Sequence, residues 1–154
     1  MAGSTTHLTP EFALVEAVET VPALRGKVAA MQPPNKTAPP FSFYVPTADS
    51  EEEDLDGPTE LQHFTGVLHI VAASARQLFT LAALVKKAVA EMRGGVYSLD
   101  EGEGLNGRIL VERSRMEQSS PDLYENEVGL YRRMYTVELD YQTEEIYGEE
   151  DDGG

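Results

Sequence analysis

The segment from Phe64 to Gly94 constrains the fold most strongly, because it predicts a strand that leads directly into a long amphipathic helix. Phe64 to Ala72 is apolar and β-branched, as expected of a central strand. Ser74 and Gln77 follow at the spacing of a capping box, in which two side chains satisfy free backbone N–H groups at a helix start. The predicted helix carries one apolar stripe, which consists of Leu78, Leu81, Ala82, Val85, Val89 and Met92. Such a stripe predicts a helix that packs on a sheet.

The rest of the chain predicts more strands than helices, and several strands follow one another. Thr9, Pro10 and Glu11 begin a short helix, since threonine caps, proline fits the first helical position and glutamate favours the positive end of the dipole. Further strands are predicted over residues 27–31, 41–45, 108–118 and 131–141. We therefore expect an α+β fold with a mostly antiparallel sheet of about four to five strands, helices packed on one face and a long acidic loop between strands.

Two of these strands show a clear alternation of apolar and polar residues. Phe41, Phe43 and Val45 alternate with Ser42 and Tyr44, which predicts one buried face. In the last strand, the predicted apolar face consists of Tyr131, Tyr135, Val137, Leu139 and Tyr141. Arg132, Thr136, Glu138 and Asp140 lie on the opposite face, and Arg133 interrupts the apolar one.

The acidity of the chain is concentrated in two short runs. Asp49 to Asp56 and Glu144 to Asp152 together hold twelve acidic residues, and without them the formal charge of −15 would be −3. The first run lies among Pro46, Gly57 and Pro58, so we predict a long exposed loop there, from about residue 48 to residue 60. The second run follows the last strand and is predicted to be a solvated tail.

The length of 154 residues favours one folded domain. We expect a flexible N-terminus at residues 1–9, a single α+β domain at residues 10–142 and a disordered-like acidic tail at residues 143–154. No cysteine is present, which excludes disulfides and thiolate metal sites. No signal peptide or membrane span is predicted, so the chain is expected to be made in the cytoplasm.

A glycine-rich stretch matches the G-x-G-x-x-G pattern at Gly102, Gly104 and Gly107. Dinucleotide binding needs a strand before this pattern and a helix after it, whereas here a strand follows. Asn106-Gly107 is a strong turn pair, and the neighbouring acids would repel a pyrophosphate. We therefore predict the tip of a mobile β-hairpin at Gly102, Gly104, Asn106 and Gly107.

No other motif predicts a metal, cofactor or catalytic site. The acidic run begins like a calcium loop, but His63 stands where the last glutamate ligand is required. His63 and His69 would lie roughly 20 Å apart on one strand, too far for a shared metal. The carboxylates lie in polar runs, and the sequence lacks the motifs of serine hydrolases, zinc proteases and P-loop enzymes. We predict a protein that is not an enzyme.

Four arginines would gather on the sheet if the last two predicted strands pair, namely Arg113, Arg115, Arg132 and Arg133. Sheet geometry favours cross-strand ion pairs with Glu112, Glu117 or Glu138. A patch of ion pairs with a partner protein is the competing interpretation. Sequence-specific binding of nucleic acid is not expected, because the chain has no basic stripe and a pI near 4.4.

Three stretches give the chain a resemblance to a known family. The first is Ala38-Pro39-Pro40-Phe41-Ser42-Phe43-Tyr44-Val45, a Pro-Pro-aromatic entry into a strand. The second is the strand and helix from Phe64 to Met92, and the third runs from Tyr124 to Arg133 into the last strand. In this order, after an N-terminal helix, they resemble the tail-terminator or tail-completion proteins of long-tailed bacteriophages and related particles.

The resemblance implies a structural virion protein at the tail-neck junction, assembled as a hexameric ring. Such a ring caps the tail tube, stops its polymerisation and offers a surface to the head-side connector or stopper protein. DNA would pass through the lumen without being held. The resemblance also makes the hairpin near Gly102 to Gly107 an interface element of the ring. We expect the acidic loop to face this lumen or the tube, through Glu51, Glu52, Glu53, Asp54 and Asp56.

Two other classes remain open from the sequence. One is a different neck or head-completion protein, which would bind the connector and would not cap tubes. The other is an unrelated acidic adaptor of the cytosol, which would not form a closed ring. The exposed strand edges of an antiparallel sheet favour an oligomer or a filament-end protein.

Overall fold

The computed structural model describes residues 9–54, 57–100 and 106–146, and it describes the backbone alone for residues 48–54, 57–60, 100, 145 and 146. The elements in chain order are α1 (Glu11–Val18), a 3-10 helix η1 (Pro22–Leu24), β1 (Val28–Ala30), β2 (Phe41–Asp54), β3 (Gly57–Ala72), α2 (Ala75–Ala90), β4 (Val96–Asp100), β5 (Asn106–Gln118), β6 (Leu123–Glu125) and β7 (Leu130–Ile146). Neither α-helix of this described part has the length and apolar character that a membrane span requires.

The strands form one seven-stranded sheet in the order β1-β2-β3-β7-β5-β4, with β6 beside the start of β7. Every pair is antiparallel except β1 with β2. The α+β class and the largely antiparallel sheet are therefore confirmed, and the sheet is larger than predicted. The strands absent from the prediction are β4 and β6, both too short to show a clear alternation.

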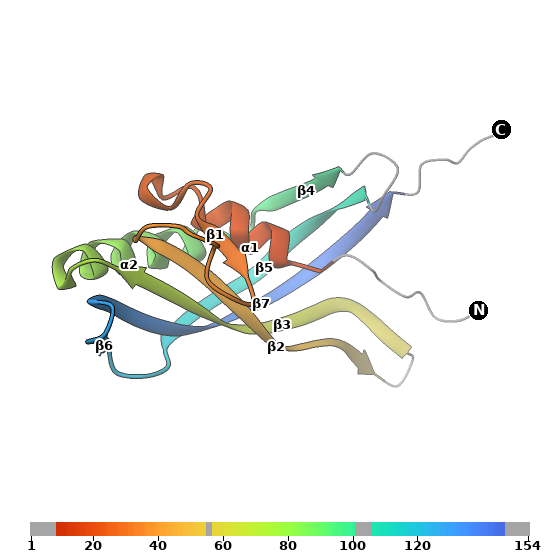
Figure 1. Ribbon diagram of the computed structural model, residues 1–154. Helices are drawn as coiled ribbons and strands as arrows, with labels where there is room; N and C mark the ends of the chain where they lie inside the picture. Colours follow the sequence, from red (N-terminus) through yellow and green to blue (C-terminus); the bar gives the residue numbers. More distant parts are fainter. Residues whose placement is uncertain (1–8, 55–56, 101–105, 147–154) are drawn as a thin grey trace.

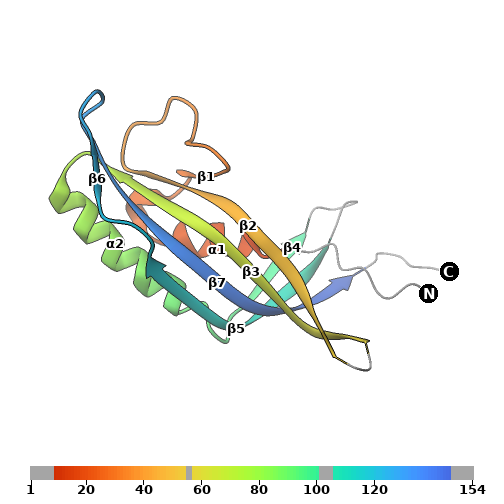
Figure 2. The ribbon, with the colours of Figure 1, turned by 90° about the horizontal axis from the view of Figure 1, so that it is seen from below.

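Both α-helices lie on the same face of this sheet, which leaves the strands of the other face visible from below (Figures 1 and 2). The apolar stripe of α2 is buried as predicted, from Leu78 to Met92. It packs on the core side of the central strands, where Phe64, Leu68 and Ile70 of β3 are also buried. The main core thus lies between the helices and one side of the sheet.

The start of α2 has the predicted capping box. The Ser74 hydroxyl accepts a hydrogen bond from the Gln77 backbone N–H at 3.1 Å. The Gln77 side-chain oxygen in turn accepts one from the Ala73 N–H at 2.8 Å. These two contacts satisfy backbone donors that have no partner inside the helix, and they fix the point at which β3 becomes α2.

The predicted alternation of β7 is confirmed. Tyr135, Val137, Leu139 and Tyr141 are buried beneath the helices, whereas the residues between them lie on the opposite side and are partly exposed. β7 continues to Ile146, beyond the expected domain boundary at residue 142. Its last part pairs with the start of β5, and Arg108 on β5 forms an ion pair with Glu144 on β7.

The first half of β2 differs from its prediction, because both of its faces are buried. Phe41 and Phe43 do form a cluster, with Val71 of β3. Tyr44, predicted to face away from the buried side, belongs to the main core under the helices. Aromatic residues at consecutive positions, such as Phe43 and Tyr44, therefore do not identify one buried face, since a sheet can have apolar contacts on both sides.

The prediction of a long acidic loop is wrong, because β2 and β3 continue as paired strands to Asp54 and Gly57. β3 pairs with β7 only from Gln62 onwards. Among the described strands, residues 57–60 of β3 therefore have only β2 beside them. We call the outer part of this hairpin, residues 49–54 and 57–60, the acidic arm; its residues 49–51 still pair with the β3 residues 62–64 that contact β7, and residues 52–54 lie beyond them. It projects from the body of the sheet, separate from the ends of β5 and β7 (Figure 1).

Candidate functional site

The side of the sheet opposite the helices, here called the bare face, carries two rows of polar and charged residues. The first row is His63, Asp140 and Arg113, and the second is Thr65, Glu138 and Arg115, in the strand order β3, β7, β5. Directly opposed residues of antiparallel strands point to the same side, so each row forms a line across three strands. The register of the sheet places these side chains together.

The charged residues of these rows are paired with one another. Arg113 Nε lies 3.3 Å from Asp140 Oδ2, and His63 Nδ1 contacts the other oxygen of the same carboxylate. Arg115 Nε donates a hydrogen bond to Glu138 Oε1 at 3.1 Å, which raises the pKa of Arg115 further above its ordinary value. Both arginines are still largely exposed, at 73% and 70% of their side-chain surface. They are available to a partner without any rearrangement of the sheet.

A depression of about 440 Å³ lies at these rows, beside the bulge where the register of β5 shifts between Val111 and Arg113. It is lined by His63, Phe64, Thr65, Arg93, Arg113, Ser114, Arg115, Glu138 and Asp140. Arg93 comes from the chain segment after α2, and no carboxylate of the described residues pairs with it. The depression therefore has three arginines and two acids in its wall.

The four arginines singled out in the sequence do not form one group. The structure brings Arg113 and Arg115 together and places Arg132 and Arg133 near the other end of β7, on opposite sides of the sheet. Arg132 forms an ion pair with Glu125 of β6. Three acids were predicted as cross-strand partners of these arginines. Among the described residues, Glu138 is the one of the three that forms such an ion pair, with Arg115.

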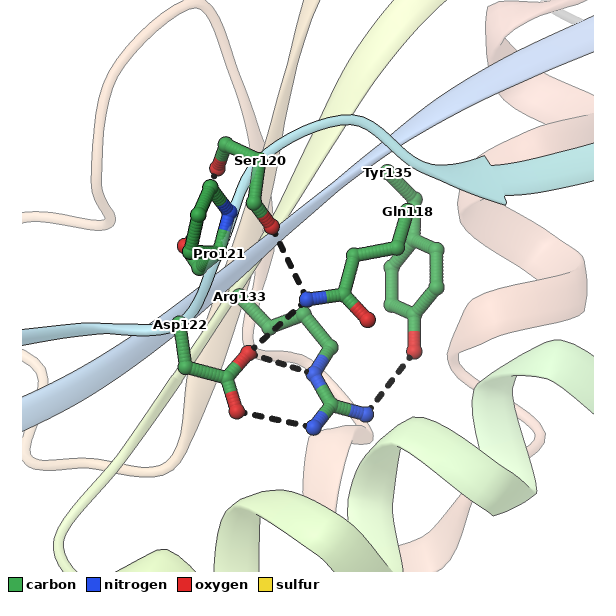
Figure 3. A network of polar contacts seen from close by, with 6 residues as sticks. All are labelled: Gln118, Ser120, Pro121, Asp122, Arg133 and Tyr135. Carbon is green, nitrogen blue, oxygen red and sulfur yellow. Dashed lines mark hydrogen bonds and ion pairs between the residues drawn. The ribbon is translucent and has the colours of Figure 1, made fainter.

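Arg133 joins the end of β5 to β7 through a network of polar contacts (Figure 3). Its Nε and Nη2 donate to the two oxygens of Asp122 at 2.7 and 2.8 Å, and its Nη1 donates to the Tyr135 hydroxyl at 3.2 Å. Gln118 Nε2 also donates to Asp122, at 3.1 Å. The hydrogen bonds to Arg133 hold the pKa of Asp122 below its ordinary value. These contacts connect β5, β7 and the segment that follows β5, so we interpret the network as one that stabilises the fold.

An aromatic cluster occupies the bare face away from the charged rows. The His69 ring stacks on Phe43 with centroids 4.3 Å apart and an angle of 8°. Burial, and secondarily the positive charge of Arg132, lowers the pKa of His69. Neutral imidazole is therefore favoured here, as expected for a ring packed against another ring. His69 is a packing residue of this cluster.

The predicted lumen-facing acids lie on the acidic arm. Glu51, Glu52, Glu53 and Asp54 are in β2, and Asp56 lies outside the described residues. The backbone register pairs Glu51 with Gln62 and Asp54 with Gly57. The described part of the run thus lies in a β-hairpin and not in a loop.

The predicted interface hairpin is placed in part. Asn106 and Gly107 begin β5 and pair with Asp100 and Leu99 of β4, so they lie in the ladder and do not form the turn. Gly102 and Gly104 lie outside the described residues. Where the structure describes side chains, it shows no group of three or more His, Asp or Glu residues that could hold a metal ion.

No protein-family model matches this sequence, and no curated protein matches it. Among solved structures, the chain is similar to a chain of the virion of a native gene transfer agent particle. The TM-score is 0.45 and the identity 15%, over 84% of this chain and 85% of the other. The bare face and the acidic arm therefore have to be interpreted from their own geometry and chemistry.

Proposed function

We propose that this chain is a structural virion protein, a tail terminator or tail-completion protein of a long-tailed bacteriophage or a related particle. In this proposal, six copies form a ring at the tail-neck junction. The ring caps the tail tube, stops its polymerisation and offers its other side to the head-side connector. The resemblance of the three sequence stretches supports this role, and so does an α+β sheet whose one face and parts of whose edges are not covered by any described helix or strand.

The observation that carries the proposal is the acidic arm. A two-stranded hairpin is marginally stable by itself, and a run of like charges weakens it further. Here Glu52, Glu53 and Asp54 lie in such a hairpin, beyond the last contact of β3 with β7. A projecting arm of this kind is well suited to a contact in an assembly, where neighbours support it.

The charge of the arm agrees with a position beside DNA that must move. Negative side chains repel phosphate, so a ring lined with them lets a DNA chain pass without binding it. The Arg113 and Arg115 rows lie on the body of the sheet and are paired with acids, which makes them unsuitable as a continuous phosphate track. We therefore place the acidic arm at the lumen or against the tube.

Charge reversal of the arm tests this placement. The triple variant Glu51→Lys, Glu52→Lys, Glu53→Lys should give particles with abnormal tail length or blocked DNA delivery, measured by electron microscopy and DNA ejection. A matched control is Glu149→Lys, Glu150→Lys, Asp151→Lys, which changes the charge equally in the second acidic run. Normal tails and normal DNA passage in the arm variant would rule out the lumen position.

The ring and its partner are tested separately from the arm. Native mass spectrometry of the chain, alone and mixed with tail tubes, should show six copies, and the tubes should stop growing when the chain is added. Binding to the connector without any effect on tube length would instead assign the chain to another neck or head-completion role. An acidic adaptor would show neither a ring nor tube capping.

A further inference from the structure

One edge of β5 has no neighbouring strand along part of its length. β4 pairs with residues 106–110 of β5, and the backbone of Gly94 and Gly95 bonds to Val111. From Arg113 to Gln118, no described strand lies on that side. Open edges of this kind present N–H and C=O groups that another strand can pair with.

A second open edge lies at the opposite side of the sheet, along β2. β1 pairs with β2 only at Ser42 to Tyr44, and the backbone N–H of Met31 makes the last contact, to the Tyr44 carbonyl. Beyond this point no described strand flanks β2 on its outer side. Pro46 lacks an N–H group, so continuous pairing is available from Thr47 to Asp54.

We propose that these two edges pair between copies, with β5 of one copy against β2 of the next. The directions of the strands fit this arrangement. Along the sheet, β2, β3, β7 and β5 alternate in direction. A neighbouring β2 that continues the alternation runs antiparallel to β5, so one sheet extends from copy to copy. This inference rests on the ring of the proposed function, and it names the contact that builds the ring.

The two edges differ strongly in charge. The β2 edge has five acids between Asp49 and Asp54. The β5 edge is close to neutral, because Arg93, Arg113 and Arg115 are balanced by acids, namely Glu112, Glu117, Glu138 and Asp140. Two β2 edges would repel each other, whereas β5 offers a nearly neutral edge with two largely exposed arginines, Arg113 and Arg115. A contact between two different surfaces also repeats from copy to copy and closes into a ring when the rotation allows.

Disulfide trapping tests the pairing directly, because the chain has no cysteine of its own. Arg115→Cys is combined with Asp49→Cys, Ser50→Cys or Glu51→Cys, since directly opposed strand residues lie within disulfide range. After oxidation at high protein concentration, at least one double variant should give a ladder of covalent dimers, trimers and larger species. Each single variant should remain monomeric under denaturing conditions.

The outcomes separate this contact from the ring itself. Covalent dimers of the Arg115→Cys single variant would show β5 against β5 and overturn the proposal. A hexamer by native mass, with no ladder in any double variant, would keep the ring and overturn the edge pairing. A monomer without a ladder at any concentration would also overturn the edge pairing, and tube capping would then decide whether the terminator role survives.

Charge exchange provides an independent measurement. Arg113→Gln with Arg115→Gln should weaken self-association by roughly tenfold or more in sedimentation, because the charged partners of the β2 edge are lost. Arg113→Glu with Arg115→Glu should weaken it further, and adding Glu51→Lys, Glu52→Lys and Glu53→Lys should restore it. The control Lys86→Glu with Lys87→Glu makes the same charge change on the exposed side of α2. Equal effects in the control, or no rescue, would contradict the pairing.

Discussion

Adjacent residues of β7 face opposite sides of the sheet, and the two sides are built in different ways. Leu139 is fully buried beneath the helices, whereas Glu138 lies on the bare face in an ion pair with an exposed arginine. The covered side is an apolar core, and much of the bare side is held by charge pairs that solvent can screen. Stability is thus concentrated on one side of the sheet, and the other side is free to evolve contacts with partners.

The largest expected difference between the two faces comes from neighbouring substitutions in β7. Leu139→Ala should lower the free energy of unfolding by about 3 kcal/mol, because it leaves a cavity in the core. Glu138→Ala should stay close to the wild type, since it removes only an exposed ion pair. Urea denaturation measures both. Similar losses in the two variants would contradict the comparison.

A smaller loss is expected for Asp122→Asn, which weakens the contact with Arg133. The free energy of unfolding at pH 7 should fall by about 1 kcal/mol, because a charged two-contact hydrogen-bond pair with the half-buried Arg133 is lost. The pKa of Asp122 is lowered in the folded state, so this stabilisation is present above the ordinary value of 3.8 and disappears as pH falls through the folded pKa. A difference from wild type that persisted at the lowest pH would count against this cause.

The capping box of α2 contributes a similar or smaller amount to the free energy of unfolding. Ser74→Ala should cost about 1 kcal/mol, because the Gln77 N–H loses its acceptor. Ser74→Asp should retain most of the stability, since aspartate also caps. Ser98→Ala, at an exposed position of β4, is the matched control. Thermal denaturation compares the three, and an equal loss in the control would remove the capping explanation.

The smallest effect concerns His69 on the bare face. Its pKa is lowered in the folded state, so the unfolded chain binds a proton more readily. Stability from this residue is therefore complete above the ordinary pKa of 6.5 and decreases as pH falls below it. His69→Phe keeps a ring against Phe43 and should flatten the dependence of stability on pH between about 7.5 and 5.5. An unchanged slope would show that His69 does not contribute to it.

The sequence predicted the features that depend on local patterns. Ser74 and Gln77 identified the start of α2, and the spacing of its apolar residues identified the buried side. The apolar face of β7 was equally clear, because its large residues recur at every second position. In these segments local preference and tertiary packing agree, which is why a single sequence is sufficient.

The features that depend on pairing could not be predicted in the same way. The acidic arm resembles a loop in sequence, since acids, proline and glycine are all rare in strands. It is a strand pair because β2 and β3 stay paired from Phe41 with Val71 to Asp54 with Gly57, through two shifts of register. Likewise, the contact of Arg113 with Asp140 depends on a bulge that shifts the register of β5 after Val111.

The central position of β7 also determines when the core can form during synthesis. β7 is the last described strand in chain order, yet it lies between β3 and β5 and provides Leu139 and Tyr141 to the core. A growing chain that has not reached Leu130 therefore exposes the apolar sides of β3 and α2 without their central partner. Contacts between residues so distant in sequence slow folding, and they leave nascent chains open to aggregation and to chaperones.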